Sequence, residues 1–165
     1  MDLFNLDKKV ALITGASSGI GQGAAVALAQ TGAHVLCAAR GEKRLRATVE
    51  QLLGKGWKAE AFILDVTDQA KVEDLFSKNK IDIVVNSAGL ARHSPALETR
   101  SEDFDDVIEV NLKSAYFLSS IAARAMIKSK IKGSIIHVSS QMAYVGGIDR
   151  AVYSASKHAL AGMIK

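Results

Sequence analysis

Tyr153, Lys157 and Ser140 are the residues whose types and spacing most directly indicate chemistry. Tyr153 and Lys157 are four positions apart, so on a helix they share one face and point into the same space. An ammonium beside a phenol favours the phenolate, which makes a tyrosine usable as a general acid and base. Ser140 precedes Tyr153 by thirteen positions, and its hydroxyl could orient a substrate oxygen. Alone, a Tyr–Lys pair is more typical of a solvated helix surface, so the chemistry needs support from a second motif.

A glycine-rich turn near the start of the chain supplies that support. Residues 14–21 follow the apolar run 10–13 and precede an alanine-rich segment, which is the order strand, turn, helix. Gly15 permits the tight turn, Gly19 lets backbone N–H groups approach a pyrophosphate, and Gly21 lets helix and strand pack closely. The start of the following helix favours a phosphate, although a plain strand-to-helix connection remains the alternative. The predicted cofactor-binding residues of the turn are Gly15, Ser17, Ser18, Gly19, Ile20 and Gly21.

The elements that would position these residues alternate between strands and helices. Short apolar runs rich in valine and isoleucine are typical of parallel strands buried on both faces. Right-handed crossovers then predict a doubly wound α/β fold, the Rossmann fold, as a single domain over residues 1–165 with helices on both faces of the sheet. We expect helices to begin at the N-caps Thr67 and Ser101. The predicted strands are 10–13, 35–39, 59–64, 81–85 and 134–139, and the predicted helices are 19–31, 42–54, 68–78, 101–128 and 151–165.

Two more motifs lie between the turn and the Tyr–Lys pair: Asn-Ser-Ala-Gly from Asn86, and Asn111 in a long predicted helix. Together with T-G-x-x-x-G-I-G and S-(12 residues)-Y-x-x-x-K, in this order, they resemble the short-chain dehydrogenase/reductase family, of the type called classical. The resemblance runs from about residue 7 to the end of the chain. It implies an oxidoreductase that acts on a secondary alcohol or a ketone with a nicotinamide dinucleotide.

The resemblance also implies a catalytic role for each of four residues. Tyr153 would donate a proton to a carbonyl oxygen in reduction and accept one from a hydroxyl in oxidation. Lys157 would also hydrogen-bond the nicotinamide ribose. Ser140 would hold the reacting oxygen, with its neighbour Ser139 as the rival candidate. Asn111 resembles the family asparagine that kinks the central helix and holds a water leading to the lysine; without the resemblance it would read as a polar residue on a solvated helix.

Further cofactor contacts are implied at the ends of two strands. Asn86 is expected to tie adjacent strands together, and Gly89 to let the cofactor lie against the backbone. Ser87 replaces the second asparagine that the family usually carries. The carboxylate at the position of Asp65 contacts the adenine ring in relatives, although a lone aspartate after a strand is otherwise most often a cap. The cofactor-binding residues implied here are Asp65, Val66, Asn86, Ala88 and Gly89, in addition to Tyr153 and Lys157.

The end of the second predicted strand decides the expected cofactor. NAD-selective relatives carry an acidic residue there, which accepts hydrogen bonds from the ribose hydroxyls. Ala39 occupies that position here, and Arg40 follows it. A guanidinium can grip a 2′-phosphate and no carboxylate repels it, so we expect NADP(H), with NAD(H) as the alternative. Ser18 is not basic, so the second basic residue of some NADP-binding relatives is absent from the turn.

Composition excludes several classes of function. The chain has 165 residues, and 21 basic against 17 acidic residues give a net charge of +4 that is spread along the sequence. Its basic clusters are not interleaved with aromatics, so we expect no nucleic-acid partner. The single cysteine, Cys37, excludes an internal disulfide and reads as a core thiol. The four histidines lack metal-ligand spacing, no apolar stretch approaches the ~20 residues that span a bilayer, and no signal peptide is evident. We therefore expect no metal, no membrane partner and a cytoplasmic location.

Length is the point at which the chain departs from the family. Family members continue past the Y-x-x-x-K helix with another strand, a substrate-covering loop, a helix and a final strand. We therefore expect the C-terminal strands to be missing here. A sequence that represents part of a longer polypeptide is favoured over a natural truncation, because a sheet without its last strands would expose an edge.

The expected partners are a small carbonyl or alcohol substrate and further copies of the chain. Residues 138–141, Leu3 with Phe4, and the link into Ile81 resemble sugar- and polyol-active members such as xylulose reductases and gluconate dehydrogenases. The helices at 101–128 and 151–165 are expected to form a homotetramer or homodimer, because their apolar residues exceed what one sheet face can cover. These residues are Ala115, Leu118, Ala122, Ala125, Met126, Ala155, Ala159, Leu160 and Met163. The alternatives are an NAD-dependent enzyme of the same family and a catalytically silent, cofactor-binding scaffold.

Overall fold

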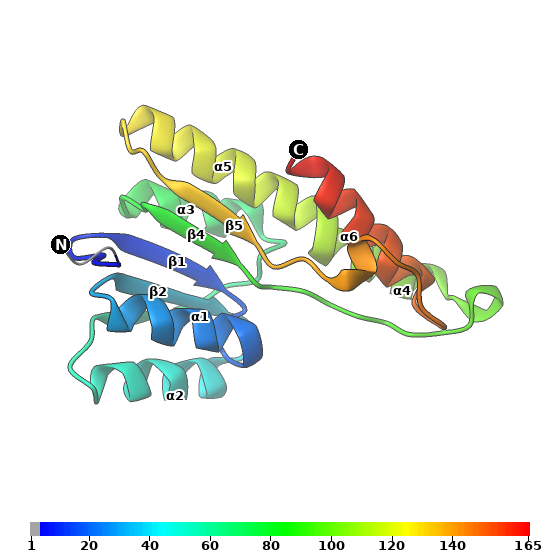
Figure 1. Ribbon diagram of the computed structural model, residues 1–165, viewed down its shortest axis with the longest axis horizontal. Coiled ribbons are helices and arrows are strands. Elements are labelled where there is room, and N and C mark those ends of the chain that lie inside the picture. Colours follow the sequence, from blue (N-terminus) through cyan, green and yellow to red (C-terminus); the bar gives the residue numbers. More distant parts are fainter. Residues whose placement is uncertain (1–3) are drawn as a thin grey trace.

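Five parallel strands form the centre of the molecule (Figure 1). A computed structural model describes residues 4–165, so Leu3 lies outside the described residues. The strand order is β3-β2-β1-β4-β5, and every neighbouring pair is parallel. The predicted doubly wound sheet is therefore confirmed. The strands are β1 (Val10–Thr14), β2 (His34–Ala39), β3 (Ala59–Ile63), β4 (Ile83–Asn86) and β5 (Ser134–His137).

Helices cover both faces of the sheet, as the sequence predicts. One buried cluster joins Ile13 and Cys37 to Leu45, and the other joins Leu12 and Leu36 to helical residues of the opposite face. Successive residues of one strand thus enter different cores, which is why the strands read as continuous apolar runs. The helices are α1 (Gly19–Gln30), α2 (Glu42–Leu53), α3 (Gln69–Lys78), α4 (Ser101–Ile108), α5 (Ser114–Lys128) and α6 (Ala151–Met163).

The order of the strands reverses at β1, whose neighbours are β2 on one side and β4 on the other. Such a switch point opens a crevice beyond the carboxyl ends of the strands. Figure 1 shows α4 and α6 extending past the arrowheads of β4 and β5, at this same end of the sheet. The fold therefore brings the glycine turn after β1 and the Tyr–Lys helix to one edge.

Two expected helix starts are wrong. The N-cap of α3 is Asp68, whose side chain accepts a hydrogen bond from the Lys71 backbone N–H, whereas Thr67 lies before it. Ser101 is already inside α4, after Arg100. Thr67 instead donates its hydroxyl and its backbone N–H to Asp65. Because several short polar residues stand side by side at each start, the sequence alone does not select the capping one.

The helix expected at 101–128 changes its helical repeat part-way along its length. A π-helical turn, η2 (Glu109–Lys113), separates α4 from α5, and Asn111 is buried inside it. A π turn adds one residue to the helical repeat, and such turns are frequent at functional sites. The predicted helical segment 101–128 is therefore continuous, with a change of helical repeat at Asn111, and the kink that the resemblance implies there stays a prediction.

The apolar surplus expected on the last helices is smaller than the sequence indicates. Five of its nine residues are already buried within the chain: Ala115, Leu118, Ala122, Met126 and Leu160. They cannot face a partner subunit, because they fill this chain's own interior. The exposed apolar side chains of these helices are instead Phe104, Tyr116, Ile127 and Ile164. The homo-oligomer thus stays a prediction that rests on a different set of residues.

Candidate active site

A cavity of about 490 Å³ lies at the carboxyl end of the sheet, a size typical of small-molecule sites. The first half of the chain supplies one side of it and residues 87–157 supply the other. Its lining residues are Gly15, Ser17, Ser18, Ile20, Ala38, Ala39, Arg40, Gly41, Arg44, Leu64, Asp65, Val66, Ser87, Ala88, Gly89, Leu90, Ala91, Val110, Val138, Ser139, Tyr153 and Lys157. Gly19, Gly21, Asn86, Asn111 and Ser140 are predicted site residues that do not line it.

The glycine turn is shaped by close backbone contacts. Gly15 adopts a φ of +66°, and a Cβ there would stand 2.7 Å from the Ser87 carbonyl oxygen. A Cβ on Gly21 would collide with the Gly15 carbonyl oxygen, so Gly21 packs α1 onto the turn as expected. Gly19 has a φ of +56° and faces open space. The turn can therefore present its backbone N–H groups to a ligand without obstruction.

Arg40 and Asp65 form the outer part of the cavity. The Arg40 guanidinium lies 3.8 Å from the Asp65 carboxylate, and both side chains are more than a third exposed. Asp65 also accepts two hydrogen bonds from Thr67 and so shapes the turn between β3 and α3, whereas the helix cap is Asp68. Arg44, in the first turn of α2, lines the same region. Arg44 was not among the residues predicted from the sequence, because nothing local distinguishes it from other arginines on helix surfaces.

Tyr153 and Lys157 share the inner wall of the cavity, as their spacing predicts. The Lys157 ammonium is 5.8 Å from the centre of the Tyr153 ring and donates a hydrogen bond of 3.0 Å to the Val138 carbonyl. Only 5% of Lys157 is exposed, and this burial lowers the pKa of its ammonium. His93 meets the Tyr153 ring edge-on, with 6.2 Å between ring centres. The pair therefore stands in a partly dry environment, where a fixed ammonium interacts strongly with a phenolate.

The two serines of the turn after β5 differ in their surroundings. Ser139 lines the cavity, although its Oγ is buried and has no hydrogen-bond partner among the described residues. The Ser140 Oγ accepts a hydrogen bond of 3.1 Å from the Met142 backbone N–H and so caps the short 3₁₀ turn η3 (Gln141–Ala143). The two candidates for the substrate-orienting hydroxyl are thus adjacent, and only Ser139 reaches the cavity wall in this structure.

Asn111 lies behind the cavity wall and ties three segments together. Its side chain accepts a hydrogen bond from the Leu90 N–H and donates to the Leu90 carbonyl and to Ser156 Oγ. Ser156 in turn donates to the Tyr153 carbonyl. Asn111 therefore connects the loop after β4 to the helix that carries Tyr153. The hydrated role expected for it remains a prediction.

Asn86 joins neighbouring strands as predicted. It accepts a hydrogen bond from the Thr14 hydroxyl on β1 and contacts His137 on β5 through its amide nitrogen. The Thr14 hydroxyl accepts a bond from the Ala88 N–H. Asn86 thus acts on the cavity through the backbone of its own loop, which explains why its side chain is not part of the wall.

A family model described as short chain dehydrogenase matches residues 9–165. The chain belongs to the short-chain dehydrogenase family.

The individual relatives are named for activity on sugar acids or on acyl chains. A 2-dehydro-3-deoxy-D-gluconate 5-dehydrogenase of Dickeya dadantii is 37% identical over 170 residues, which cover 100% of this chain and 66% of the relative. A 3-oxoacyl-[acyl-carrier-protein] reductase of Thermotoga maritima is 36% identical, with 97% and 67% covered. The crystal structure of a gluconate 5-dehydrogenase from Burkholderia cenocepacia in complex with NADP and tartrate gives a TM-score of 0.89 at 30% identity, covering 97% of this chain and 64% of that one. The chain thus spans about two thirds of the length of these relatives.

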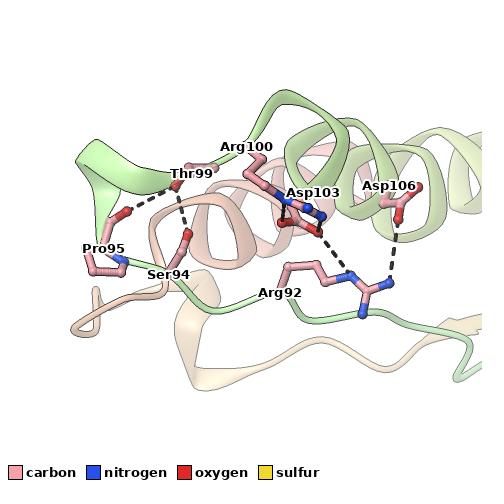
Figure 2. A network of polar contacts seen from close by, with 7 residues as sticks. All are labelled: Arg92, Ser94, Pro95, Thr99, Arg100, Asp103 and Asp106. Atoms are coloured by element: carbon pink, nitrogen blue, oxygen red, sulfur yellow. Dashed lines mark hydrogen bonds and ion pairs between the residues drawn. The ribbon is translucent and has the colours of Figure 1, made fainter.

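The loop after β4 belongs to the site, because residues 87–91 line the cavity. Figure 2 shows Arg92 of this loop between two carboxylates of α4, at 3.4 Å from Asp103 and 3.6 Å from Asp106. Arg100 pairs with Asp103 at 2.9 Å, which lowers the pKa of that carboxyl through the hydrogen bond. These contacts hold the loop against α4, next to the position of His93.

Residues 4–165 contain no group of three or more histidine, cysteine or acidic side chains that could hold a metal ion. None of the helices in this part of the chain is both long enough and apolar enough to cross a bilayer. Cys37 is buried, and desolvation raises the pKa of its thiol to about 11, so it is a core residue as predicted.

Proposed function

We propose that the protein is an NADP(H)-dependent oxidoreductase that interconverts a secondary alcohol and a ketone. The observation that carries this proposal is that Tyr153 and Lys157 line the same cavity as the glycine turn after β1. A proton-transfer pair and a dinucleotide-binding turn are thereby within reach of one bound molecule.

The cavity fits a dinucleotide that carries a 2′-phosphate. A Cβ on Gly15 or Gly21 would collide with the neighbouring backbone and force the turn into another shape. The open space at Gly19 leaves the backbone N–H groups of the turn accessible. At the outer end, Arg40 and Arg44 offer two guanidinium groups to a phosphate. Support also comes from the Burkholderia cenocepacia relative, whose structure contains NADP. A preference for NAD(H) is the alternative, which the Asp65 carboxylate near Arg40 would favour.

Bound NADP(H) supplies the hydride to the carbonyl carbon or accepts it in the reverse direction. Tyr153 donates its hydroxyl proton to the carbonyl oxygen during reduction and takes a proton from the alcohol during oxidation. Lys157, held by the Val138 carbonyl, stabilises the phenolate that remains. Ser140 holds the reacting oxygen, with Ser139 as the alternative donor. Asn111 fixes the helix of Tyr153 relative to the loop after β4.

The substrate class that we propose is a sugar acid or polyol. The names of the dehydrogenases from Dickeya dadantii and Burkholderia cenocepacia support this class. The reductase from Thermotoga maritima has nearly the same identity to the chain and makes 3-oxoacyl thioesters the second class to test. A homodimer or homotetramer formed through α4, α5 and α6 is part of the proposal, and a cytosolic location remains a prediction.

The test is a panel of substrates with both cofactors. Oxidation of NADPH and of NADH is followed with keto-sugar acids, simple ketoses and a 3-oxoacyl thioester. We expect turnover with NADPH and at least one keto-sugar acid. Turnover with the thioester alone would replace the substrate class, and a protein that binds NADPH but turns over none of these compounds would favour the silent scaffold.

A further inference from the structure

His137 uses both nitrogens of its ring. It is the last residue of β5, and Nδ1 lies 3.2 Å from Asn86 Nδ2 while Nε2 lies 2.8 Å from Ser119 Oγ. The ring therefore connects the loop after β4 with α5. It does not line the cavity, and the function proposed above does not use it.

Backbone groups at both ends of this chain of hydrogen bonds fix its direction. At one end, the Ala88 N–H donates to Thr14 Oγ1 at 3.2 Å, and the Thr14 hydroxyl donates to Asn86 Oδ1 at 2.7 Å. The Asn86 amide nitrogen can then only donate, so it requires an unprotonated Nδ1 on His137.

At the other end, the Ser119 hydroxyl donates to the Ala115 carbonyl at 2.8 Å, so its lone pairs face His137 Nε2. Nε2 must therefore carry the proton. The reversed arrangement would leave the Thr14 hydroxyl proton without an acceptor in this network. His137 is thus held as the neutral Nε2–H tautomer, with each donor in the network matched to an acceptor.

Two parts of the active site are connected to this ring, one through hydrogen bonds and one through the chain itself. On one side, the network ends at the Ala88 N–H, and Ala88 lines the cavity. On the other side, the next residue, Val138, gives its carbonyl to the Lys157 ammonium at 3.0 Å. A shift of the His137 ring would therefore move the cofactor loop and the anchor of Lys157 together.

We propose that His137 is a positioning residue: as the neutral Nε2–H tautomer, it holds the cofactor loop at Ala88 in register with the Val138 carbonyl that anchors Lys157. A proton on Nδ1 would face the donating Asn86 amide and break the network. Among the groups facing the ring, Asn86, Thr14 and Ser119 are neutral, and Lys157 on α6 is the charged one. In agreement, burial first and the Lys157 charge second lower the pKa of His137.

The first test needs neither substrate nor cofactor. In ¹⁵N NMR spectra of the imidazoles, we expect His137 to show a protonated Nε2 and an unprotonated Nδ1 at neutral pH, and to titrate below the usual histidine pKa of ~6.5. A protonated Nδ1, or titration near the usual pKa, would overturn the proposal.

Three substitutions separate positioning from packing. His137→Asn keeps an acceptor at the place of Nδ1, His137→Gln keeps a donor at the place of Nε2, and His137→Phe keeps neither. We expect the Ala88 amide signal to move in the Gln and Phe variants and to stay near its wild-type position in the Asn variant. The dissociation constant for NADPH should rise at least about tenfold for Gln and Phe and less than about threefold for Asn. His34→Asn, on β2 beside Glu60, is the control and should change neither quantity.

The inference about cofactor affinity rests on the proposed function, but the Ala88 signal does not. A wild-type protein that binds neither NADPH nor NADH would refute the proposed function, while the tautomer and the Ala88 signal would still decide the role of His137. Equal changes at Ala88 in all three variants would show that the ring merely fills space and would overturn the proposal.

Discussion

The two ends of the cavity are built in opposite ways. At the outer end, the Arg40 side chain is 67% exposed and lies 3.8 Å from Asp65, whose side chain is 39% exposed. At the inner end, Lys157 and Asn111 are buried, and each makes hydrogen bonds to backbone groups. Exposed charges contribute little to folding, whereas buried polar groups cost much when they lose a partner. Substitutions of exposed residues at the outer end should therefore change ligand binding with little effect on folding, whereas substitutions of the buried residues at the inner end should destabilise the fold.

The largest effect is expected at the inner end, from Tyr153→Phe. This change removes only the hydroxyl that transfers the proton, so turnover should fall at least about a hundredfold, as for loss of a general acid. The dissociation constant for NADPH should stay within about twofold, because the ring and its contacts with His93 and Lys157 remain. Steady-state rates and a fluorescence titration measure the two quantities. A variant that kept more than about a tenth of the wild-type rate would end the assignment.

Ser140→Ala and Ser139→Ala form a matched pair that tests which serine at the inner end holds the reacting oxygen. If Ser140 holds the reacting oxygen, its removal should lower kcat by about ten- to a hundredfold, and Ser139→Ala should lower it less than threefold. Because Ser140 also caps η3, the unfolding temperature of the Ser140→Ala variant has to be compared with that of the wild type. The reverse order of the two rates would transfer the role to Ser139, which lines the cavity.

Asn111→Ala tests whether the inner end is also structural. The change leaves the Leu90 N–H and carbonyl without their side-chain partner, so the free energy of unfolding should fall by about 1–3 kcal/mol. Chemical denaturation measures it. Asn79→Ala is the control, because Asn79 makes one side-chain hydrogen bond, to Leu75 at the end of α3, and should cost less. Equal losses of unfolding free energy for the two variants would mean that Asn111 stabilises the fold no more than Asn79 does.

At the outer end, Ala39→Asp combined with Arg40→Ala should move the preference from NADPH toward NADH. The change removes one charged phosphate contact, worth ~1.5–3 kcal/mol, and adds an acceptor for the ribose hydroxyls, which corresponds to at least about tenfold. Because Ala39 is buried, the unfolding temperature of the variant has to be compared with that of the wild type. Arg46→Ala is the control, since Arg46 pairs with Glu42 on the same helix and does not line the cavity. An unaltered preference would show that Arg40 does not select the cofactor.

The two ends also differ in how far the sequence predicts them. The strands, the glycine turn and the shared wall of Tyr153 and Lys157 follow from periodicity and motif spacing, because backbone geometry fixes them locally. The π turn at Asn111 does not, since it accompanies hydrogen bonds to Leu90, 21 positions away, and the different surroundings of Ser139 and Ser140 do not, since two adjacent serines look alike in the sequence.

The positions of Arg44 and His137 in the site could not be predicted from the sequence either. Arg44 is an ordinary helix residue in the sequence, and only the position of α2 brings it to the cavity. His137 was one of four scattered histidines, and its role emerges from contacts with Asn86 and Ser119, 51 and 18 positions away. Contacts at such separations leave no local pattern that a reading of one sequence could detect.

The most direct test of the central claim is a double-mutant cycle between the two ends of the cavity. Dissociation constants for NADPH and NADH are measured for the wild type, for Tyr153→Phe, for Ala39→Asp with Arg40→Ala, and for all three changes together. The account predicts that the outer substitutions shift the NADPH/NADH ratio equally with and without Tyr153→Phe, within about 0.5 kcal/mol, as for independent sites. A coupling free energy above about 1 kcal/mol would contradict the division of the cavity into a catalytic end and a cofactor-selecting end.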